Sequence, residues 1–223
     1  MPVIAIVGAG PGLGSSIARR FGREGFTVAL ISRSTANLDR LAAGLAETGI
    51  GATGFAADVR DRPTVTKALE AAAARLGPID VLEYSPAPHG APSGPAMTDV
   101  LHATAENVQP QVEFYVYGAI AAVQAVLPGM LERGRGTLLF TTGASSAVTM
   151  PAMGNVGIAG AGLRNYALAL NAALADRGIY AAHVPLAVYL GSGGPETQPG
   201  TIAELYWDLY VSRDQPERLY AAP

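Results

Sequence analysis

The sequence of 223 residues contains no cysteine and has a formal net charge of only −3. The absence of cysteine excludes disulfide bonds, thiolate nucleophiles and cysteine-ligated zinc. The small negative charge provides no basic surface of the kind that binds nucleic acid or an anionic membrane. We therefore expect a small-molecule substrate or ligand and no nucleic acid partner.

Long apolar runs are also missing from the sequence, since none approaches the roughly 18 residues that span a bilayer. Met1 is followed almost directly by an apolar segment, without the basic stretch and cleavage site of a secretory signal. From these two absences we expect a soluble, cytoplasmic protein that makes no membrane contact.

Short apolar segments alternate along the chain with longer segments of helical periodicity. This alternation predicts an α/β fold in which helices cover both faces of a parallel sheet. The predicted strands are residues 3–7, 26–32, 51–57, 79–85, 137–142 and 179–185. No repeat, linker or block of charge divides the sequence, so we expect residues 1–223 to form a single domain.

Two segments rich in glycine and proline, 85–95 and 190–200, follow the fourth and the sixth predicted strand. Open α/β sheets bind their ligands beyond the carboxyl ends of the strands. We therefore expect both segments to shape the substrate pocket. A helix is predicted over 201–210, with Thr201 as its N-cap and Glu204 in the capping-box position.

The segment VGAGPGLGSSIARRF, residues 7–21, predicts a strand, a glycine-rich turn and a helix. Gly8, Gly12 and Gly14 have the spacing GxxxGxG, whereas the commoner GxGxxG would need a glycine in place of Leu13. Such glycines let backbone N–H groups approach a pyrophosphate at the positive end of the following helix. The alternative is a glycine-rich turn that binds no ligand.

Ser32 and Arg33 follow the second predicted strand, where an NAD site usually carries a carboxylate for the ribose hydroxyls. The guanidinium of Arg33 could instead pair with a 2′-phosphate. The alternative is a solvated surface arginine. The predicted cofactor is therefore NADP(H) rather than NAD(H).

This combination of features resembles the short-chain dehydrogenases/reductases over essentially the whole chain. The resemblance also rests on the segments ADV, residues 57–59, and QAVLPGMLERGRGTLLFTTG, residues 124–143. It implies a Rossmann-type doubly wound sheet of about seven strands, with a dinucleotide across the strand ends. The cofactor-binding residues that it implies are Gly8, Gly12, Leu13, Gly14, Ser32, Arg33, Asp58 and Val59.

The sequence departs from this family at the residues that carry out catalysis. Members use a Tyr-xxx-Lys pair, a serine about thirteen residues before the tyrosine, and an asparagine on the preceding helix. In this sequence the tyrosine, lysine, serine and asparagine positions hold Val156, Gly160, Gly143 and Tyr115, respectively. In the family the tyrosine is the general acid/base and the lysine lowers its pKa. Because this sequence has neither residue at these positions, it lacks the usual proton donor.

Other side chains near these positions are candidate replacements, and the catalytic residue stays open. The candidates are Tyr115, Ser145 and His89, with Thr141, Thr142 and Ser146 also around the serine position. The alternative is that they pack or bond to local backbone groups. We interpret His183 as a strand residue with a satisfied ring, and we expect no metal site, because no His/Asp/Glu cluster has ligand spacing.

Two functions are compatible with this pattern. The first is an NADP(H)-dependent oxidoreductase that acts on a carbonyl or alcohol with a non-standard active site. The second is a catalytically silent dinucleotide-binding protein, acting as a sensor or as a non-catalytic subunit.

The family resemblance also implies a homodimer or homotetramer formed through helices predicted over 104–132 and 154–177. Leu163, Tyr166, Leu170 and Leu174 share one face of the second helix and would line that interface, unless they pack within the chain. Its first turns contain Gly157, Gly160 and Gly162, each about 1 kcal/mol less favourable in a helix than alanine. We expect these glycines to let the helix backbone approach a neighbouring surface closely.

Overall fold

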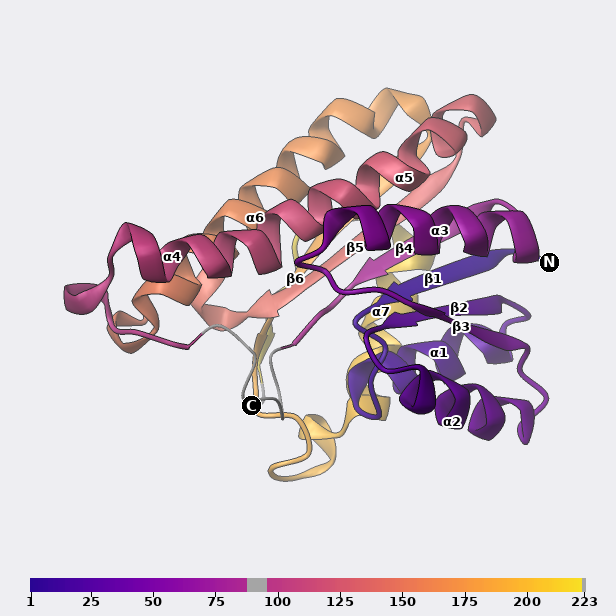
Figure 1. Ribbon diagram of the computed structural model, residues 1–223, viewed down its shortest axis with the longest axis horizontal. Helices are drawn as coiled ribbons and strands as arrows, with labels where there is room; N and C mark the ends of the chain where they lie inside the picture. Colours follow the sequence, from indigo (N-terminus) through magenta and orange to yellow (C-terminus); the bar gives the residue numbers. More distant parts are fainter. Residues whose placement is uncertain (88–95, 222–223) are drawn as a thin grey trace.

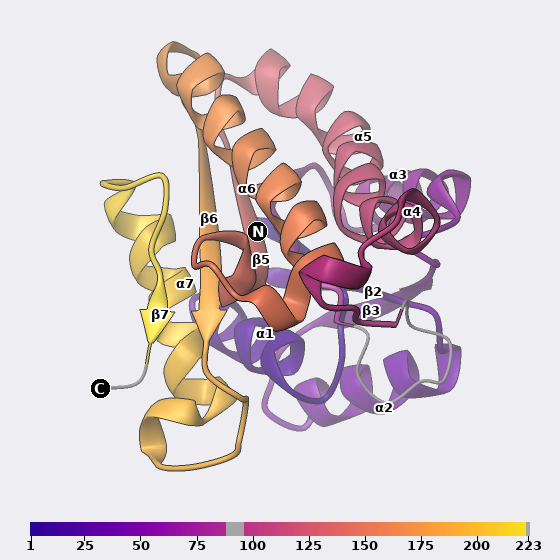
Figure 2. The same cartoon turned by 90° about the vertical axis from the view of Figure 1, so that its left-hand side faces the viewer.

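The computed structural model describes residues 1–87 and 96–221. Their core is a seven-stranded parallel sheet with the order β3-β2-β1-β4-β5-β6-β7 (Figures 1 and 2). The strands are β1 Val3–Val7, β2 Thr27–Ser32, β3 Ala52–Ala56, β4 Ile79–Tyr84, β5 Gly136–Gly143, β6 Ile179–Ala187 and β7 Tyr220–Ala221. The predicted α/β fold with a doubly wound parallel sheet is confirmed.

Helices cover both faces of this sheet (Figures 1 and 2). One face carries α1 Leu13–Arg23, α2 Thr35–Ala46 and α7 Pro199–Ser212, and the other carries α3 Arg62–Leu76, α5 Gly118–Arg133 and α6 Gly154–Leu174. Alternate residues of a strand point to opposite faces. In β1, Ala5 and Val7 enter the core beneath α3 and α5, whereas Ile4 and Ile6 enter the core beneath α1 and α7.

A turn of π-helix, Glu113–Tyr117, joins α4 Ala105–Val112 to α5. The buried hydroxyl of Tyr84, at the end of β4, donates a hydrogen bond to the carbonyl of Phe114 in this turn at 2.7 Å. Next to the turn, a Cβ at Gly118 would lie 2.7 Å from the carbonyl oxygen of Val59. The π turn and the start of α5 are therefore held close to the carboxyl ends of β4 and β3.

The helical stretch from Ala105 to Arg133 is apolar and long enough, by length and composition, to cross a membrane. This result corrects the expectation that no segment of the chain would pass such a test. Half of its most apolar window is buried inside the protein, as in the core helix of a folded domain. Ala119, Ala122 and Val123 are among the residues that α5 packs into the core.

The predicted N-cap of α7 is wrong. The helix begins at Pro199, and the residue before it, Gln198, has extended backbone angles. Proline suits the first turn of a helix because its missing N–H would have no partner there. Thr201 lies inside the helix, and its hydroxyl donates to the carbonyl of Pro195 at 2.8 Å.

The segment 190–200 is a compact turn organised around Thr197. The amide of Gly191 donates to the Thr197 carbonyl at 2.8 Å, and the amide of Gly193 donates to the Thr197 hydroxyl at 3.0 Å. The turn follows β6, as predicted. Of the other predicted substrate segment, 85–95, residues 88–95 lie outside the described residues.

The apolar stripe of α6 faces the protein's own sheet. Leu163 and Leu174 are buried in the core beneath α6, and Tyr166 and Leu170 pack against the same core. Leu163 and Leu174 therefore follow the alternative interpretation, because they pack within the chain and are closed to an interface between subunits. Tyr166 and Leu170 are only partly buried, and an interface through them stays a prediction.

The glycines of α6 lie against neighbouring segments, as expected. A Cβ at Gly157 would be 3.3 Å from the carbonyl oxygen of Ser145, and one at Gly160 would be 3.1 Å from Cβ of Ser146. Both contacts are tighter than ordinary van der Waals packing. Because Gly157 and Gly160 have no side chains, α6 can lie directly on the segment that follows β5.

Candidate active site

The glycine turn between β1 and α1 lies at the carboxyl edge of the sheet, where the strand order reverses beside β1. This edge is the ligand site of open α/β sheets. Gly8 has a φ of 104°, and a Cβ there would lie 2.6 Å from the backbone nitrogen of Pro86, so the turn requires glycine. Gly14 is constrained as well, because its Cβ would lie 3.1 Å from Cα of Ala9.

Gly12 has a different role in this turn. It is the N-cap of α1, no side chain caps the helix there, and a Cβ on Gly12 would meet no atom within 4 Å. The adjacent Leu13 turns its side chain into the core beneath α1. The open side of the turn thus presents backbone and the positive end of a helix dipole, which together suit a phosphate group.

The residues predicted to bind the ribose and adenine follow β2 and β3 at the same edge. Ser32 ends β2, and Arg33 is exposed beyond it. The carboxylate of Asp58 accepts a hydrogen bond from the amide of Arg60 at 3.0 Å and lies 3.6 Å from its guanidinium. Val59 is buried beside Gly118. Asp58 and Val59 therefore also stabilise the turn that they occupy.

The four replaced catalytic positions lie around the end of β5 and the start of α6. Gly143, the last residue of β5, is exposed, and a Cβ there would meet no atom within 4 Å. Gly160 is buried against Ser146, and Val156 packs against the core. The only lysine in the whole sequence is Lys67, on α3. A substitute for the family lysine at the start of α6 is therefore absent.

Tyr115 occupies the asparagine position in the π turn. Its ring is buried and stacks edge-on against Phe114, with the centroids 5.0 Å apart. Burial raises the pKa of Tyr115 to about 12. A phenol with such a pKa is a poor proton donor near neutral pH, so Tyr115 fits a packing role better than a catalytic one.

The other two candidate residues have different outcomes. Ser145 is half-buried, and its carbonyl oxygen lies against Gly157. Its neighbour Ser146, rather than Ser145 itself, has the hydroxyl that joins a buried hydrogen-bond chain. His89 lies outside the described residues.

A chain of buried polar groups runs from the end of β5 to the surface. Ser146 Oγ lies 2.7 Å from Thr142 Oγ1, which lies 2.8 Å from Nε2 of His183. Nδ1 of His183 lies 2.9 Å from the carboxylate of Glu217, and Arg164 donates to the same carboxylate at 2.8 Å. His183 is a fully buried strand residue with both ring nitrogens bonded, as predicted, but its partners were not predicted.

A fully buried carboxyl group, that of Glu83 of β4, faces the opposite side of the sheet. Its oxygens accept hydrogen bonds from Ser85 at 2.8 Å and from Thr141 at 3.0 Å, and Thr141 also contacts the hydroxyl of Tyr206 at 2.7 Å. Burial raises the pKa of Glu83 to about 8, although both hydrogen bonds oppose this shift. Glu83 is therefore largely protonated at neutral pH.

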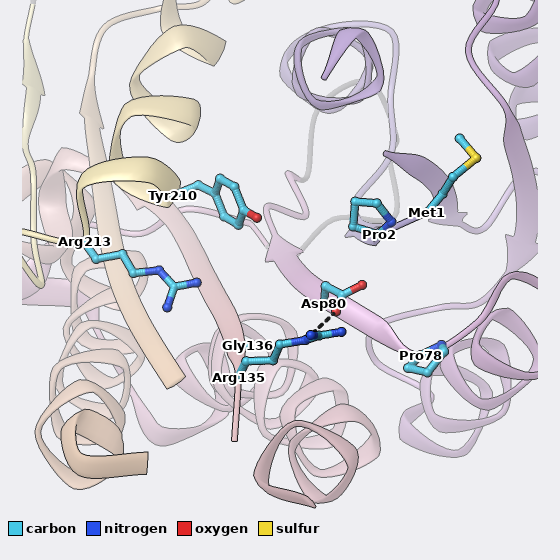
Figure 3. Close-up of a pocket in the computed structure, with 8 residues that line it drawn as sticks. All are labelled: Met1, Pro2, Pro78, Asp80, Arg135, Gly136, Tyr210 and Arg213. Atoms are coloured by element: carbon cyan, nitrogen blue, oxygen red, sulfur yellow. Dashed lines mark ion pairs between the residues drawn. The ribbon is translucent and has the colours of Figure 1, made fainter. Parts of the chain in front are cut away.

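A cavity of about 450 Å³ lies at the other edge of the sheet, where β4 and β5 begin (Figure 3). It is lined by Met1, Pro2, Pro78, Asp80, Arg135, Gly136, Tyr210 and Arg213. Asp80 and Arg135 form an ion pair across it at 3.7 Å. Because the cavity is at the amino ends of the strands, it is separate from the site at the glycine turn. Within residues 1–87 and 96–221, no group of three or more His, Asp or Glu side chains could hold a metal ion.

Residues 2–190 match the family model described as short chain dehydrogenase. The match covers most of the chain, so this protein belongs to the short-chain dehydrogenase family. A putative ketoacyl reductase from Streptomyces coelicolor is 34% identical over 139 residues, which are 61% of this chain and 51% of that protein. The chain thus spans about half the length of the curated relatives it matches.

Solved structures show the same fold. A short-chain dehydrogenase from Rhodopseudomonas palustris is 26% identical, with a TM-score of 0.82 over 100% of this chain and 99% of that one. L-Sorbose reductase from Gluconobacter frateurii, complexed with NADPH and L-sorbose, is 20% identical, with a TM-score of 0.83 over 98% of this chain and 94% of that one. The chain therefore shares the fold of these proteins over nearly the whole length of the two structures.

Proposed function

We propose that this protein is an NADP(H)-dependent oxidoreductase that interconverts a carbonyl and an alcohol group on a small molecule. The observation that carries the proposal is the open glycine turn at α1 with Arg33 beyond the end of β2, both at the carboxyl edge of the sheet. The complex of L-sorbose reductase with NADPH supports the choice of cofactor.

The residues at this edge suit a dinucleotide. Open space beside Gly12 and the uncapped start of α1 would accommodate the pyrophosphate. The guanidinium of Arg33 would pair with the 2′-phosphate, while Ser32 adds a hydroxyl beside it. A reduced nicotinamide supplies a hydride when it is bound.

We also propose that the protein works in the cytoplasm.

A specific observation favours the second candidate function, a silent dinucleotide-binding protein. Val156 and Gly160 provide neither a phenol nor an ammonium group, and the only lysine of the sequence, Lys67, lies on α3. General acid/base catalysis contributes about 10²–10⁴-fold to the rate. Binding of NADPH without turnover of any carbonyl compound would identify this second function.

Calorimetric titration with NADPH and NADH tests the cofactor assignment. We expect the native protein to bind NADPH more tightly than NADH. Arg33→Asp should weaken the binding of NADPH by at least about tenfold, or about 1.4 kcal/mol, without weakening the binding of NADH. Arg177→Asp is the matched control, because Arg177 is exposed before β6, at the amino edge of the sheet, and the change in charge is the same. Equal affinity of the native protein for the two cofactors would refute the assignment.

Turnover is tested separately by following nicotinamide absorbance with a panel of ketones, aldehydes and alcohols. Oxidation of NADPH by any ketone in the panel supports the oxidoreductase. Tight NADPH binding without absorbance change across the panel supports the silent protein instead.

A further inference from the structure

Glu217 is held against His183 by the backbone on both sides of it. The amide of His183 donates to the carbonyl of Pro216 at 2.9 Å, and the amide of Arg218 donates to the carbonyl of His183 at 3.0 Å. These bonds align the segment around Glu217 in parallel with β6. The imidazole and the carboxylate therefore face each other in a fixed geometry.

The carboxylate determines which ring nitrogen of His183 carries the hydrogen. Since a carboxylate only accepts, Nδ1 of His183 donates to Glu217, and Nε2 of the neutral ring accepts from Thr142. Thr142 can then accept from Ser146. The hydroxyl of Thr142 and that of Ser146 also have the carbonyl of Gly143 as a second acceptor, at 3.1 and 3.0 Å. Both hydroxyls can consequently reverse their hydrogen-bond direction without losing a partner.

The inner end of this chain lies at the replaced catalytic positions. Ser146 Oγ is hydrogen bonded to Gly143, the family's serine position, and Ser146 Cβ packs against Gly160, the family's lysine position. The outer end reaches solvent, because the side chains of Glu217 and Arg164 are 22% and 39% exposed. Ser146 and Thr142 are each only 5% exposed. The chain therefore joins the replaced catalytic positions to the ion pair between Glu217 and Arg164 at the protein surface.

We infer that Ser146, Thr142 and His183 exchange a proton with the substrate oxygen while Glu217 orients the imidazole; these four residues are here called the buried relay. The inference rests on the oxidoreductase function proposed above. Ser146 is the catalytic residue that exchanges the proton with substrate, and Thr142 and His183 act through it. Glu217 is a positioning residue that orients the imidazole.

The proton balance of carbonyl reduction follows from these contacts. Two electrons reach the carbonyl carbon with the hydride that a reduced nicotinamide supplies, and the carbonyl oxygen takes the proton of Ser146 Oγ. Ser146 then takes the proton of Thr142, and Thr142 takes the Nε2 proton of protonated His183. After the alcohol has left, a hydronium ion from the solvent at the site returns a proton through Ser146 and Thr142 to Nε2, since Nδ1 already carries the hydrogen that it donates to Glu217. Alcohol oxidation uses the same transfers in reverse, with neutral His183 as the final proton acceptor.

The charges around His183 decide the direction of its pH dependence. Burial lowers the pKa of His183, the hydrogen bond that Nδ1 donates to Glu217 opposes this shift, and the positive charge of Arg164 adds to it. The hydrogen bond from Arg164 lowers the pKa of Glu217, so Glu217 stays ionised while His183 titrates. On the Nε2 side of His183, the side chains of Thr142 and Ser146 are uncharged. Reduction should therefore slow as the pH rises through the pKa of His183, and oxidation should accelerate.

The test compares two valine substitutions of neighbouring threonines on β5. Thr142→Val removes the relay hydroxyl at constant side-chain size, and Thr142→Ser restores a hydroxyl. Thr141→Val is the matched control, because Thr141 faces the other side of the sheet and bonds to Glu83. Each variant is assayed for ketone reduction and alcohol oxidation across about pH 5 to about pH 8. We expect Thr142→Val to lose about 10²-fold in rate and its pH dependence, Thr142→Ser to regain most of both, and Thr141→Val to keep the native pH profile.

A second measurement uses the cofactor-free protein and does not depend on turnover. Nuclear magnetic resonance of the ¹⁵N-labelled imidazole follows the protonation of His183 across the same pH range. We expect the ring to titrate and its pKa to change in Thr142→Val but not in Thr141→Val. A ring that keeps one protonation state throughout would refute the relay even if the protein reduces ketones.

The outcomes separate the relay from the proposed function. Ketone reduction that keeps its rate and pH profile in Thr142→Val overturns the relay and leaves the oxidoreductase function intact. A native protein that binds NADPH but turns over no substrate overturns the oxidoreductase function, and with it the relay's role in catalysis.

Discussion

The buried carboxyl group of Glu83 should make the stability of this protein fall as the pH rises. Its pKa is about 8 in the folded protein, compared with 4.5 for an ordinary glutamate. Between these values the folded protein binds more protons than the unfolded chain, so the free energy of unfolding decreases by about 1.4 kcal/mol per pH unit. The stabilisation by protonated Glu83 is complete below about pH 4.5 and is lost as the pH passes about 8.

Glu83→Gln should remove this dependence, because an amide imitates the protonated carboxyl group and stays neutral. We expect the variant to match the native protein near pH 4.5 and to be about 3 kcal/mol more stable at pH 7. In urea unfolding at two pH values, this difference corresponds to a midpoint shift of roughly 1 M or more. Glu70→Gln, at an exposed position of α3, is the control and should show no such shift. A Glu83→Gln stability difference that is the same at both pH values would refute the reasoning.

Three other predictions follow from the glycines and the exposed face of α6. Gly8→Ala should lower the free energy of unfolding by about 3 kcal/mol or more, because its φ is positive and its Cβ would meet backbone; unchanged urea unfolding would contradict this. Gly160→Lys alone should destabilise the fold through its 3.1 Å contact, whereas combining it with Val156→Tyr and Gly143→Ser should accelerate ketone reduction at least about tenfold. A triple variant no faster than the native protein would argue against the alignment. We propose a homodimer or homotetramer formed through helices 104–132 and 154–177; light scattering should give its mass, Ile158→Glu on the exposed face of α6 should reduce that mass, and a monomeric native protein would exclude it.

The sequence predicted the features that depend on contiguous patterns. The apolar strands and the glycine turn at residues 7–21 each lie within one short segment, and their geometry follows from local sterics and burial. The close approach of α6 was predictable in the same way, because Gly157 and Gly160 have no side chain to keep the helix away from a neighbour.

The hydrogen-bond partners of His183 and the burial of Glu83 could not be predicted from contiguous sequence patterns. His183 and Glu217 are 34 positions apart, and they meet only because the segment after α7 returns beside β6. Glu83 occurs within an apolar strand, and the sequence alone does not tell that Thr141 and Ser85 will bury and bond it. Leu163 and Leu174 on α6 were assigned to an interface for a related reason: periodicity identifies an apolar face but does not tell whether the covering surface belongs to the same chain.

The return of the segment around Glu217 to β6 also affects biosynthesis. A ribosome must translate beyond Glu217 before the carboxylate can reach His183, although β6 and its neighbours have been made by then. Until that moment the outer edge of β6 has no strand beside it, and the imidazole has no anionic partner. Nascent chains of this protein therefore pass through a stage at which that edge could pair with another chain. Their yield should depend on how quickly the last strand is added.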